Sequence, residues 1–259
     1  MKFNSWQDYE KFVAEVKHKN RFIHSSEAAR FLDNIREMLP ARTFSLPAGS
    51  ILFRAQIGFR DGNIHDYEGS KVIEAFESER MKPLPLQAAG GRANPKGVPY
   101  LYLSDDEVTS LSELRPQITQ HLSLARFTTN RNIKLVDCCS LVGPNHYTSC
   151  IFNPPKSQEE IGNAIWSIIN IAFTRPVNNN ESSSDYIPTQ ILAELFKTEG
   201  FDGVRYKSNL GVGNNFALFD LGLVDLASCT LRKTESINYN FEDCGTPCPV
   251  RGVTHEDYM

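Results

Sequence analysis

The chain has 259 residues, of which 41% are hydrophobic, so it can form one compact domain with an appendage, or two small domains, around a sizeable core. Its formal net charge of −4 excludes the generally basic surface that nucleic-acid binding requires. No apolar run approaches the ~20 residues that span a bilayer, and the N-terminus lacks the apolar stretch of a secretory signal, so we expect a cytoplasmic protein with no membrane partner and with six reduced cysteines.

Two helices are predicted at the start of the chain. The first follows Ser5, a candidate cap with Asp8 three residues later. The second begins near Ser25–Ser26 and ends before Pro40. The first helix has an apolar face with helical spacing, made of Trp6, Tyr9, Phe12, Val13 and Val16. We therefore expect residues 1–47 to form a helical hairpin that packs on the main domain.

The rest of the chain mixes short strands, helices and turns. Strands are predicted at Ser50–Ala55, Tyr100–Ser104, Ile118–Phe127, Ile133–Val136, Val204–Tyr206 and Phe216–Phe219. Helices are predicted at Lys71–Arg80, from Ser104 or Asp105 to Arg115, at Glu159–Phe173, and from Pro188 to Gly200. Asn178–Asp185 is polar and low in complexity, and we expect a flexible loop or lid there. Residues 222–259 are expected to form an irregular C-terminal tail.

The predicted strands and helices do not alternate regularly, and no GxGxxG sequence follows a strand. These features favour an α+β fold over a doubly wound one.

Arg92 is the first candidate for chemistry, because it lies in the turn sequence GGRANPKG. Gly90 and Gly91 allow the backbone to approach a ligand closely, and a guanidinium held there could grip a pyrophosphate with two hydrogen bonds. An ordinary surface arginine in a turn has the same local sequence.

Tyr102 lies on the predicted strand YLYLS, where alternation places it on the face of Tyr100 and opposite Leu101 and Leu103. A tyrosine that faces a cleft can stack on a cationic ring, although a tyrosine at the edge of the core has the same pattern.

Four further residues are candidates by their places in the predicted elements. Arg54 ends a predicted strand, and Glu113 lies on the flank of a buried helical stripe. Ser208 and Asn215 bracket a glycine-bearing loop that could offer polar groups to a ligand. A solvated glutamate or an ordinary hairpin loop would look the same at each position.

The order and spacing of these residues are more specific than any one of them. The strand with Arg54, then GGRANPKGVPYLYLS, then Glu113, and finally the block from Pro188 to Asp220 together resemble the RES domain family. This family is named for its arginine, glutamate and serine, and is best known as the toxin of toxin–antitoxin pairs. The resemblance covers roughly residues 48–221, which we expect to form the catalytic domain.

The resemblance implies a compact fold similar to ADP-ribosyltransferase toxins and an activity on NAD in a bacterial toxin or defence effector. It also implies an antitoxin or immunity protein as partner, and a homo-oligomer is compatible with the sequence. It assigns catalysis to Glu113, Arg54, Tyr102 and Ser208, and contacts with NAD to Arg92, Gly91, Asn94, Tyr100 and Asn215.

These residues suit cleavage of the nicotinamide–ribose bond. Nicotinamide leaves as a neutral molecule, so no general acid is needed, and one carboxylate can stabilise the positive charge that develops on the ribose. The two arginines would neutralise the pyrophosphate, and no metal is required. Water as acceptor would give a glycohydrolase, and phosphate would give a phosphorylase.

Three alternatives remain open at this level. A protein side chain as acceptor would make the chain an ADP-ribosyltransferase. A module that binds NAD or ADP-ribose without catalysis is favoured by Ala93, because the family usually has an aromatic residue there. A zinc site could use Cys244, Cys248 and His255, although the spacing lacks paired CxxC motifs and offers no clear fourth ligand apart from Cys229 or acidic residues.

Overall fold

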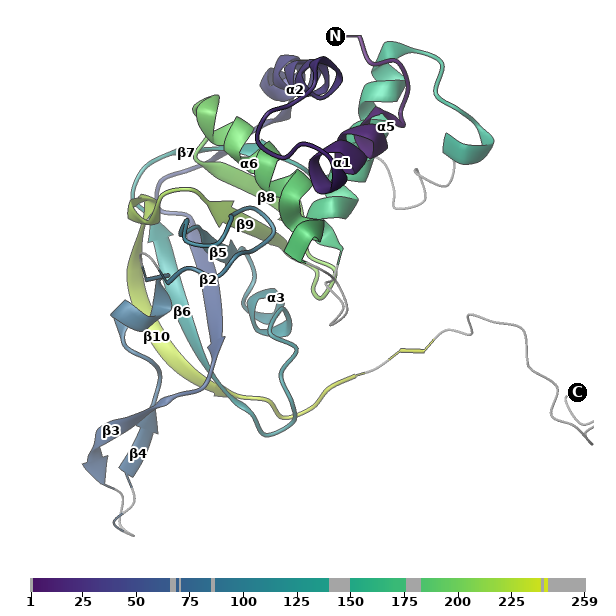
Figure 1. Ribbon diagram of the computed structural model, residues 1–259. Coiled ribbons are helices and arrows are strands. Elements are labelled where there is room, and N and C mark those ends of the chain that lie inside the picture. Colours follow the sequence, from purple (N-terminus) through teal and green to yellow (C-terminus); the bar gives the residue numbers. More distant parts are fainter. Residues whose placement is uncertain are drawn as a thin grey trace, which may run out of the picture.

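The computed structural model describes residues 2–65, 69, 71–84, 87–139, 150–175, 183–238 and 240–241. Its centre is an eight-stranded mixed sheet with the order β1-β7-β8-β9-β5-β2-β6-β10, in which only β7 and β8 are parallel neighbours (Figure 1). The strands are β1 (Thr43–Leu46), β2 (Ile51–Ile57), β5 (Leu101–Ser104), β6 (His121–Thr129), β7 (Ile133–Asp137), β8 (Gly203–Lys207), β9 (Asn214–Leu218) and β10 (Val224–Lys233). A separate hairpin consists of β3 (Arg60–His65) and β4 (Lys71–Glu74).

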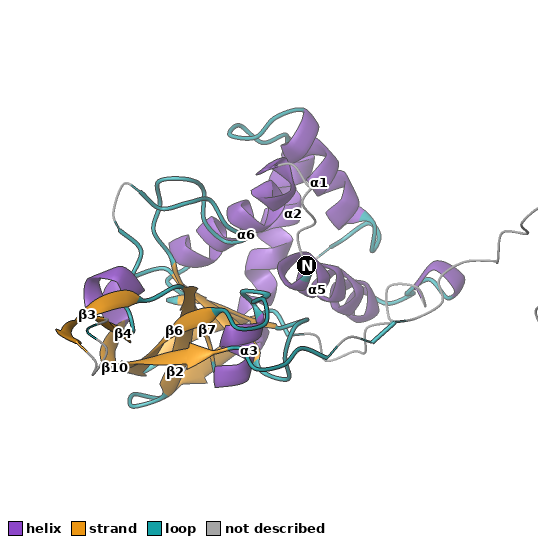
Figure 2. Ribbon diagram, turned by 90° about the horizontal axis from the view of Figure 1, so that it is seen from below, coloured by secondary structure: helices purple, strands orange, loops and turns teal. Residues whose placement is uncertain are grey.

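Helices gather on one side of this sheet, while the short α3 lies apart from them (Figures 1 and 2). The helices are α1 (Asp8–His18), α2 (Ser26–Met38), α3 (Glu107–Ser112), α5 (Gln158–Thr174) and α6 (Ile187–Thr198). Single 3₁₀ turns are η1 (Leu39–Arg42), η2 (Ser78–Met81), η3 (Ser183–Tyr186) and η4 (Leu221–Leu223). The mixed sheet with helices grouped beside it confirms the predicted α+β class. Among the described residues, no helix is long and apolar enough to cross a membrane.

Two hydrophobic cores lie on the two faces of the sheet. On the helical side, Phe12, Trp166 and Phe196 pack in one cluster with sheet residues such as Val204. On the other side, Leu101, Leu103, Phe127, Leu135, Phe216 and Leu218 form the second cluster. Tyr102 packs against the helical core, so the predicted alternation of YLYLS is confirmed.

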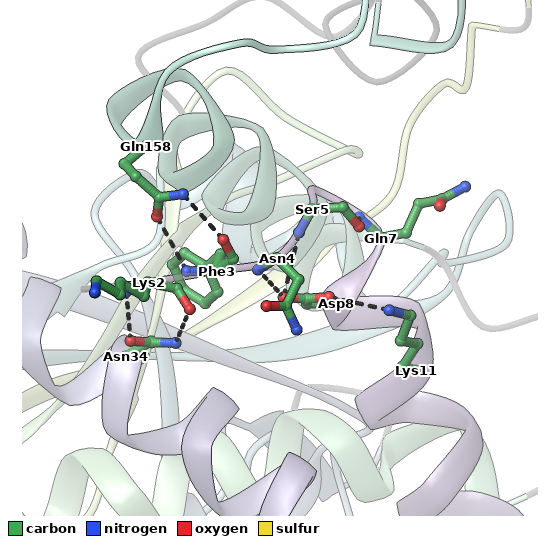
Figure 3. A network of polar contacts seen from close by, with 9 residues as sticks. All are labelled: Lys2, Phe3, Asn4, Ser5, Gln7, Asp8, Lys11, Asn34 and Gln158. Atoms are coloured by element: carbon green, nitrogen blue, oxygen red, sulfur yellow. Dashed lines mark hydrogen bonds and ion pairs between the residues drawn. The ribbon is translucent and has the colours of Figure 1, made fainter.

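The N-terminal segment is tied to the helical layer by paired hydrogen bonds (Figure 3). The side-chain amide of Gln158 on α5 both accepts from the backbone N–H of Phe3 and donates to its carbonyl, each over 3.0 Å. Asn34 on α2 does the same for the backbone of Lys2, over 3.0 and 3.2 Å. The carboxylate of Asp8 accepts from the backbone N–H of Asn4 at 2.7 Å. These contacts fix the start of α1 between α2 and α5.

Of the two predicted helix caps, the cap at Ser25 is confirmed and the cap at Ser5 is wrong. Ser25 caps α2 by accepting from the backbone N–H of Ala28 at 3.2 Å, as expected. Ser5 does not cap α1, which begins at Asp8 after Gln7. The Asp8 carboxylate instead accepts from the backbone N–H groups of Asn4 and Ser5, and the Ser5 hydroxyl accepts from the backbone N–H of Gln7 at 3.1 Å, so this pair fixes the turn before the helix.

The predicted helix Lys71–Arg80 is wrong. Lys71–Glu74 is strand β4, which pairs with β3 and is held there by an ion pair of 2.5 Å between Arg60 and Glu74. Only Ser78–Met81 forms a helical turn. Cross-strand pairing of the β-branched Val72 and Ile73 therefore outweighs the helical propensity of the surrounding charged residues.

The predicted boundaries of the catalytic domain do not coincide with the ends of the central sheet. Residues 222–259 were expected to be irregular, but Val224–Lys233 forms β10, which pairs with β6 along its whole length. At the other end, β1 pairs with β7 although it lies within the expected N-terminal extension. The predicted boundaries at 47/48 and 221/222 therefore separate strands that belong to one sheet. Residues 178–182 of the expected lid lie outside the described residues.

Candidate active site

A cavity of about 320 Å³ lies where β5, β9 and β2 meet α3 and the start of α6. Its lining is made of Arg54, Ala55, Gly91, Arg92, Tyr102, Leu103, Ser104, Ser110, Glu113, Leu114, Tyr186, Tyr206 and Asn215. A second cavity of about 210 Å³ shares Arg92, Glu113 and Tyr186 with the first. The fold thus brings together six of the predicted site residues from separate segments: Arg54, Gly91, Arg92, Tyr102, Glu113 and Asn215. The volume suits a small-molecule ligand.

Glu113 follows the last turn of α3, and its carboxylate is oriented by two donors. Its Oε1 atom accepts from the hydroxyl of Ser208 and from Nδ2 of Asn215, each over 2.6 Å. The Asn215 amide is itself fixed, because its Oδ1 accepts from Ser104 at 2.6 Å. Within the described part of the chain, Oε2 of Glu113 has no hydrogen-bond partner. One carboxylate oxygen is therefore held and the other is left for a ligand.

The loop that carries Ser208 is held against α3. Thr109 accepts from the backbone N–H of Gly213 at 3.0 Å, and Asp105 accepts from both the backbone and the side chain of Asn214 at 2.7 Å. A Cβ atom at Gly211 or Gly213 would collide with Thr109. These glycines let the loop approach the helix closely, which brings Ser208 within reach of Glu113.

The GGR turn is fixed from two sides. Tyr102 donates to Asn94 at 2.7 Å and accepts from the backbone N–H of Ala93 at 2.9 Å. Gly91 has no room for a side chain, because a Cβ would lie 2.6 Å from the Tyr102 hydroxyl. From α6, Gln190 donates to the carbonyls of Gly91 and Asn94 at 2.8 and 3.0 Å.

Arg92 emerges from this turn into both cavities. Its backbone carbonyl accepts from the Thr189 hydroxyl at 2.6 Å, and its guanidinium donates to the carbonyl of Arg175. It forms no ion pair with a described carboxylate. The backbone of Arg92 is therefore fixed, while no carboxylate among the described residues pairs with its positive charge.

Arg54 is the second cation of the cavity and is more deeply placed. Its guanidinium donates to the carbonyl of Tyr102 over 3.5 Å, and its Nε is buried without a hydrogen-bond partner. Burial lowers the pKa of Arg54, although arginine remains protonated at neutral pH. No ion pair joins it to any carboxylate of the described residues. A half-buried cation that no described carboxylate neutralises is costly, so this position favours an anionic ligand.

Three of the predicted site residues do not line either cavity. Asn94 is 2% exposed, and its amide donates to the carbonyls of Ala89, Pro95 and Val98 within its own turn. Tyr100 is buried against Phe219, and this burial raises its pKa to about 12. Ser208 contacts two residues that line the cavities, Glu113 and Leu210, without lining them itself. Asn94 therefore shapes the turn, and Tyr100 contributes to the core.

Ala93 also belongs to the core. It is fully buried in the helical cluster and is absent from the cavity lining. Ala93 therefore contributes to the packing beneath the turn and not to the lining of this cavity.

Several residues of the site were not predicted from the sequence. Ser104 could have been found, because it follows Tyr102 by two positions on the same strand. Tyr206 likewise precedes Ser208 by two positions, and burial raises its pKa. No local sequence pattern predicts site roles for Tyr186, Thr189 and Gln190. Their roles depend on where the start of α6 meets the GGR turn.

No group of three or more potential metal ligands occurs among the described residues. The zinc alternative rested on Cys244, Cys248 and His255, which lie outside the part of the chain that the structure describes.

Comparison with known proteins identifies one family. The profile of the RES domain matches residues 71–240, a stretch that contains Arg92, Tyr102, Glu113, Ser208 and Asn215 but not Arg54. No curated protein matches. Among solved structures, the crystal structure of the M. tuberculosis MbcT-MbcA toxin-antitoxin complex is similar at 13% identity with a TM-score of 0.36, and the match covers 77% of this chain and 91% of that chain.

Proposed function

The chain belongs to the RES domain family, and from that premise we propose that it cleaves the nicotinamide–ribose bond of NAD. The observation that carries this proposal is the carboxylate of Glu113, which is oriented by Ser208 and Asn215 and lines the same cavity as two arginines that pair with no carboxylate of the described residues. A fixed negative charge beside two cation sites is complementary to a ribose that becomes positive next to a pyrophosphate.

The proposed reaction breaks the bond between C1′ of the ribose and the pyridinium nitrogen. The bonding electron pair stays on that nitrogen, so nicotinamide departs neutral and the ribose becomes an oxocarbenium. Oε2 of Glu113 stabilises this charge or accepts a hydrogen bond from a ribose hydroxyl. Arg54 and Arg92 bind the pyrophosphate, and the ring of Tyr102 forms part of the wall for the nicotinamide.

The acceptor decides the product. Attack by water on C1′ gives ADP-ribose, with the water proton released to solvent. Attack by inorganic phosphate would give ADP-ribose carrying a new phosphate on C1′, and attack by a protein nucleophile would give an ADP-ribosylated protein. We propose hydrolysis or phosphorolysis, and the second product of the reaction decides between these acceptors.

The deciding experiment incubates the purified full chain with NAD and a chelator and follows nicotinamide by chromatography. We expect release of nicotinamide without added metal, with ADP-ribose or its phosphorylated form as the second product. Labelled NAD with cell lysate tests for transfer to protein. Binding of NAD with no nicotinamide release, or a stoichiometric need for zinc, would overturn the proposal.

We also propose that the chain acts as a bacterial toxin or defence effector that an antitoxin or immunity protein restrains. The family match supports this role. Expression in bacteria should arrest growth and lower cellular NAD, and Glu113→Gln should relieve both effects at an equal protein level.

A further inference from the structure

The N-terminal helix α1 makes a direct contact with the rim of the proposed site. Lys17, in its last turn, forms an ion pair with Asp185 of η3. The side chains are 19% and 34% exposed, so the pair is partly shielded from water, in contrast to the pair of Lys11 and Asp8 at the start of the helix, where Lys11 is 51% exposed. The two partners are separated by 168 positions of sequence.

The residue after Asp185 is Tyr186, which lines both cavities together with Arg92 and Glu113. Tyr186 also precedes the first residue of α6, without a side-chain cap of that helix. Its backbone carbonyl lies 3.0 Å from the hydroxyl of Thr189, the same hydroxyl that donates to the carbonyl of Arg92. A displacement at Asp185 would therefore reach the cavity through both Tyr186 and Arg92.

Helix α1 is firmly packed in the protein and can therefore hold Lys17 against Asp185. Val16, next to Lys17, is 1% exposed in the helical core, and Phe12 is 2% exposed one turn earlier. The helix touches α5 and α6, and its start is fixed by the hydrogen bonds drawn in Figure 3. A side chain projecting from such an anchored helix can hold a short turn in place.

We propose that Lys17 is a positioning residue, which through Asp185 holds Tyr186 as an aromatic wall for a planar ring of the dinucleotide. The inference rests on the proposed function, because it takes NAD as the ligand of the cavity. It assigns a role to the N-terminal helices, which lie outside the stretch matched by the family profile. An aromatic side chain that stacks on a nucleotide base contributes more to affinity than a surface ion pair does.

The test compares four variants of the full chain. We expect Lys17→Met to raise the KM for NAD about twofold to fivefold with little change in kcat. Lys11→Met, on the same helix but paired with Asp8, should match the parent chain.

Tyr186→Leu should weaken NAD binding about tenfold, and Tyr186→Phe, which keeps the ring, should bind several-fold more tightly than Tyr186→Leu. A loss shared by NAD and ADP-ribose places the adenine at Tyr186, while a loss for NAD alone places the nicotinamide there.

Hydrogen exchange provides a readout that does not depend on turnover. Lys17→Met should speed exchange of the backbone amides of residues 185–187, 189 and 190, and Lys11→Met should not. If the parent chain binds NAD without releasing nicotinamide, the proposed reaction fails while these comparisons still decide the inference. Exchange in Lys17→Met that equals that in Lys11→Met, or NAD binding by Tyr186→Leu that equals that of the parent chain, overturns it.

Discussion

Ser208 donates a 2.6 Å hydrogen bond to Glu113 across 95 positions of sequence. The bond joins the loop between β8 and β9 to the end of α3 and fixes the direction of the carboxylate. The Ser208 hydroxyl also accepts from the backbone N–H of Leu210 at 3.0 Å, which fixes the serine in turn. Ser208 lines neither cavity, and we propose that it orients Glu113.

The variant Ser208→Ala should therefore lower kcat for nicotinamide release about tenfold, the equivalent of one hydrogen bond to a charged group. The KM for NAD should change less than twofold, because the groups that bind the pyrophosphate are unaltered. Steady-state kinetics give both values, with Ser228→Ala on the exposed side of β10 as control. A large rise in KM with unchanged kcat would place Ser208 in substrate binding instead.

The variant Arg92→Ala should weaken NAD binding more than tenfold, because a hydrogen bond to a charged group contributes about 1.5–3 kcal/mol. Thermal stability should fall little, since the turn is held by its backbone and by Tyr102, Thr189 and Gln190. Calorimetric titration and thermal melts measure the two effects. Arg30→Ala on α2, which does not line the cavity, is the matched control. Unchanged affinity would remove Arg92 from the site.

Local patterns predicted the elements whose side chains alternate or repeat clearly. In the strand YLYLS, Tyr102 and Leu101 pack into the hydrophobic clusters on opposite faces of the sheet. Helix α2 begins directly after Ser25, the residue predicted to cap it. The helix predicted at residues 71–80 is wrong because the helical propensity of this segment competes with strand pairing to β3. Local periodicity cannot identify β3 as the pairing partner.

The site itself depends on contacts between distant segments. Glu113 lies on an exposed flank of α3, and only its bonds with Ser208 and Asn215 distinguish it from a solvated glutamate. The family resemblance supplied that grouping, whereas helical position alone could not. The ion pair of Lys17 with Asp185 had no signal in the sequence, because nothing local relates the end of α1 to the turn before α6.

Alkaline pH should destabilise the fold through buried phenols. Burial raises the pKa of Tyr9, Tyr102 and Tyr206 above the ordinary value of 10.0. The unfolded chain therefore ionises these groups first, so their contribution to stability is complete below about pH 10 and is lost as the pH rises above it. Melting temperatures measured from pH 8 to pH 11 should be level at first and then fall. Absorbance of ionised tyrosine should rise together with unfolding for these three groups, and their full ionisation in a folded chain would contradict the prediction.

The variant Glu113→Gln should nearly abolish turnover while NAD still binds. Glutamine has the same shape, and its carbonyl oxygen can still accept from Ser208 and Asn215, so the local structure is retained. The negative charge is lost, and that charge matters chiefly when the oxocarbenium forms, so the loss appears in kcat and not in affinity. Removal of one preorganised electrostatic group typically costs roughly a hundredfold to a thousandfold in rate.

Glu107→Gln is the matched control, because Glu107 lies on the same helix and is paired with Arg232 outside the cavity. Single-turnover kinetics with calorimetric binding of NAD separate the two effects. Near-normal turnover by a folded Glu113→Gln protein would return Glu113 to an ordinary solvated glutamate and would defeat the proposed mechanism.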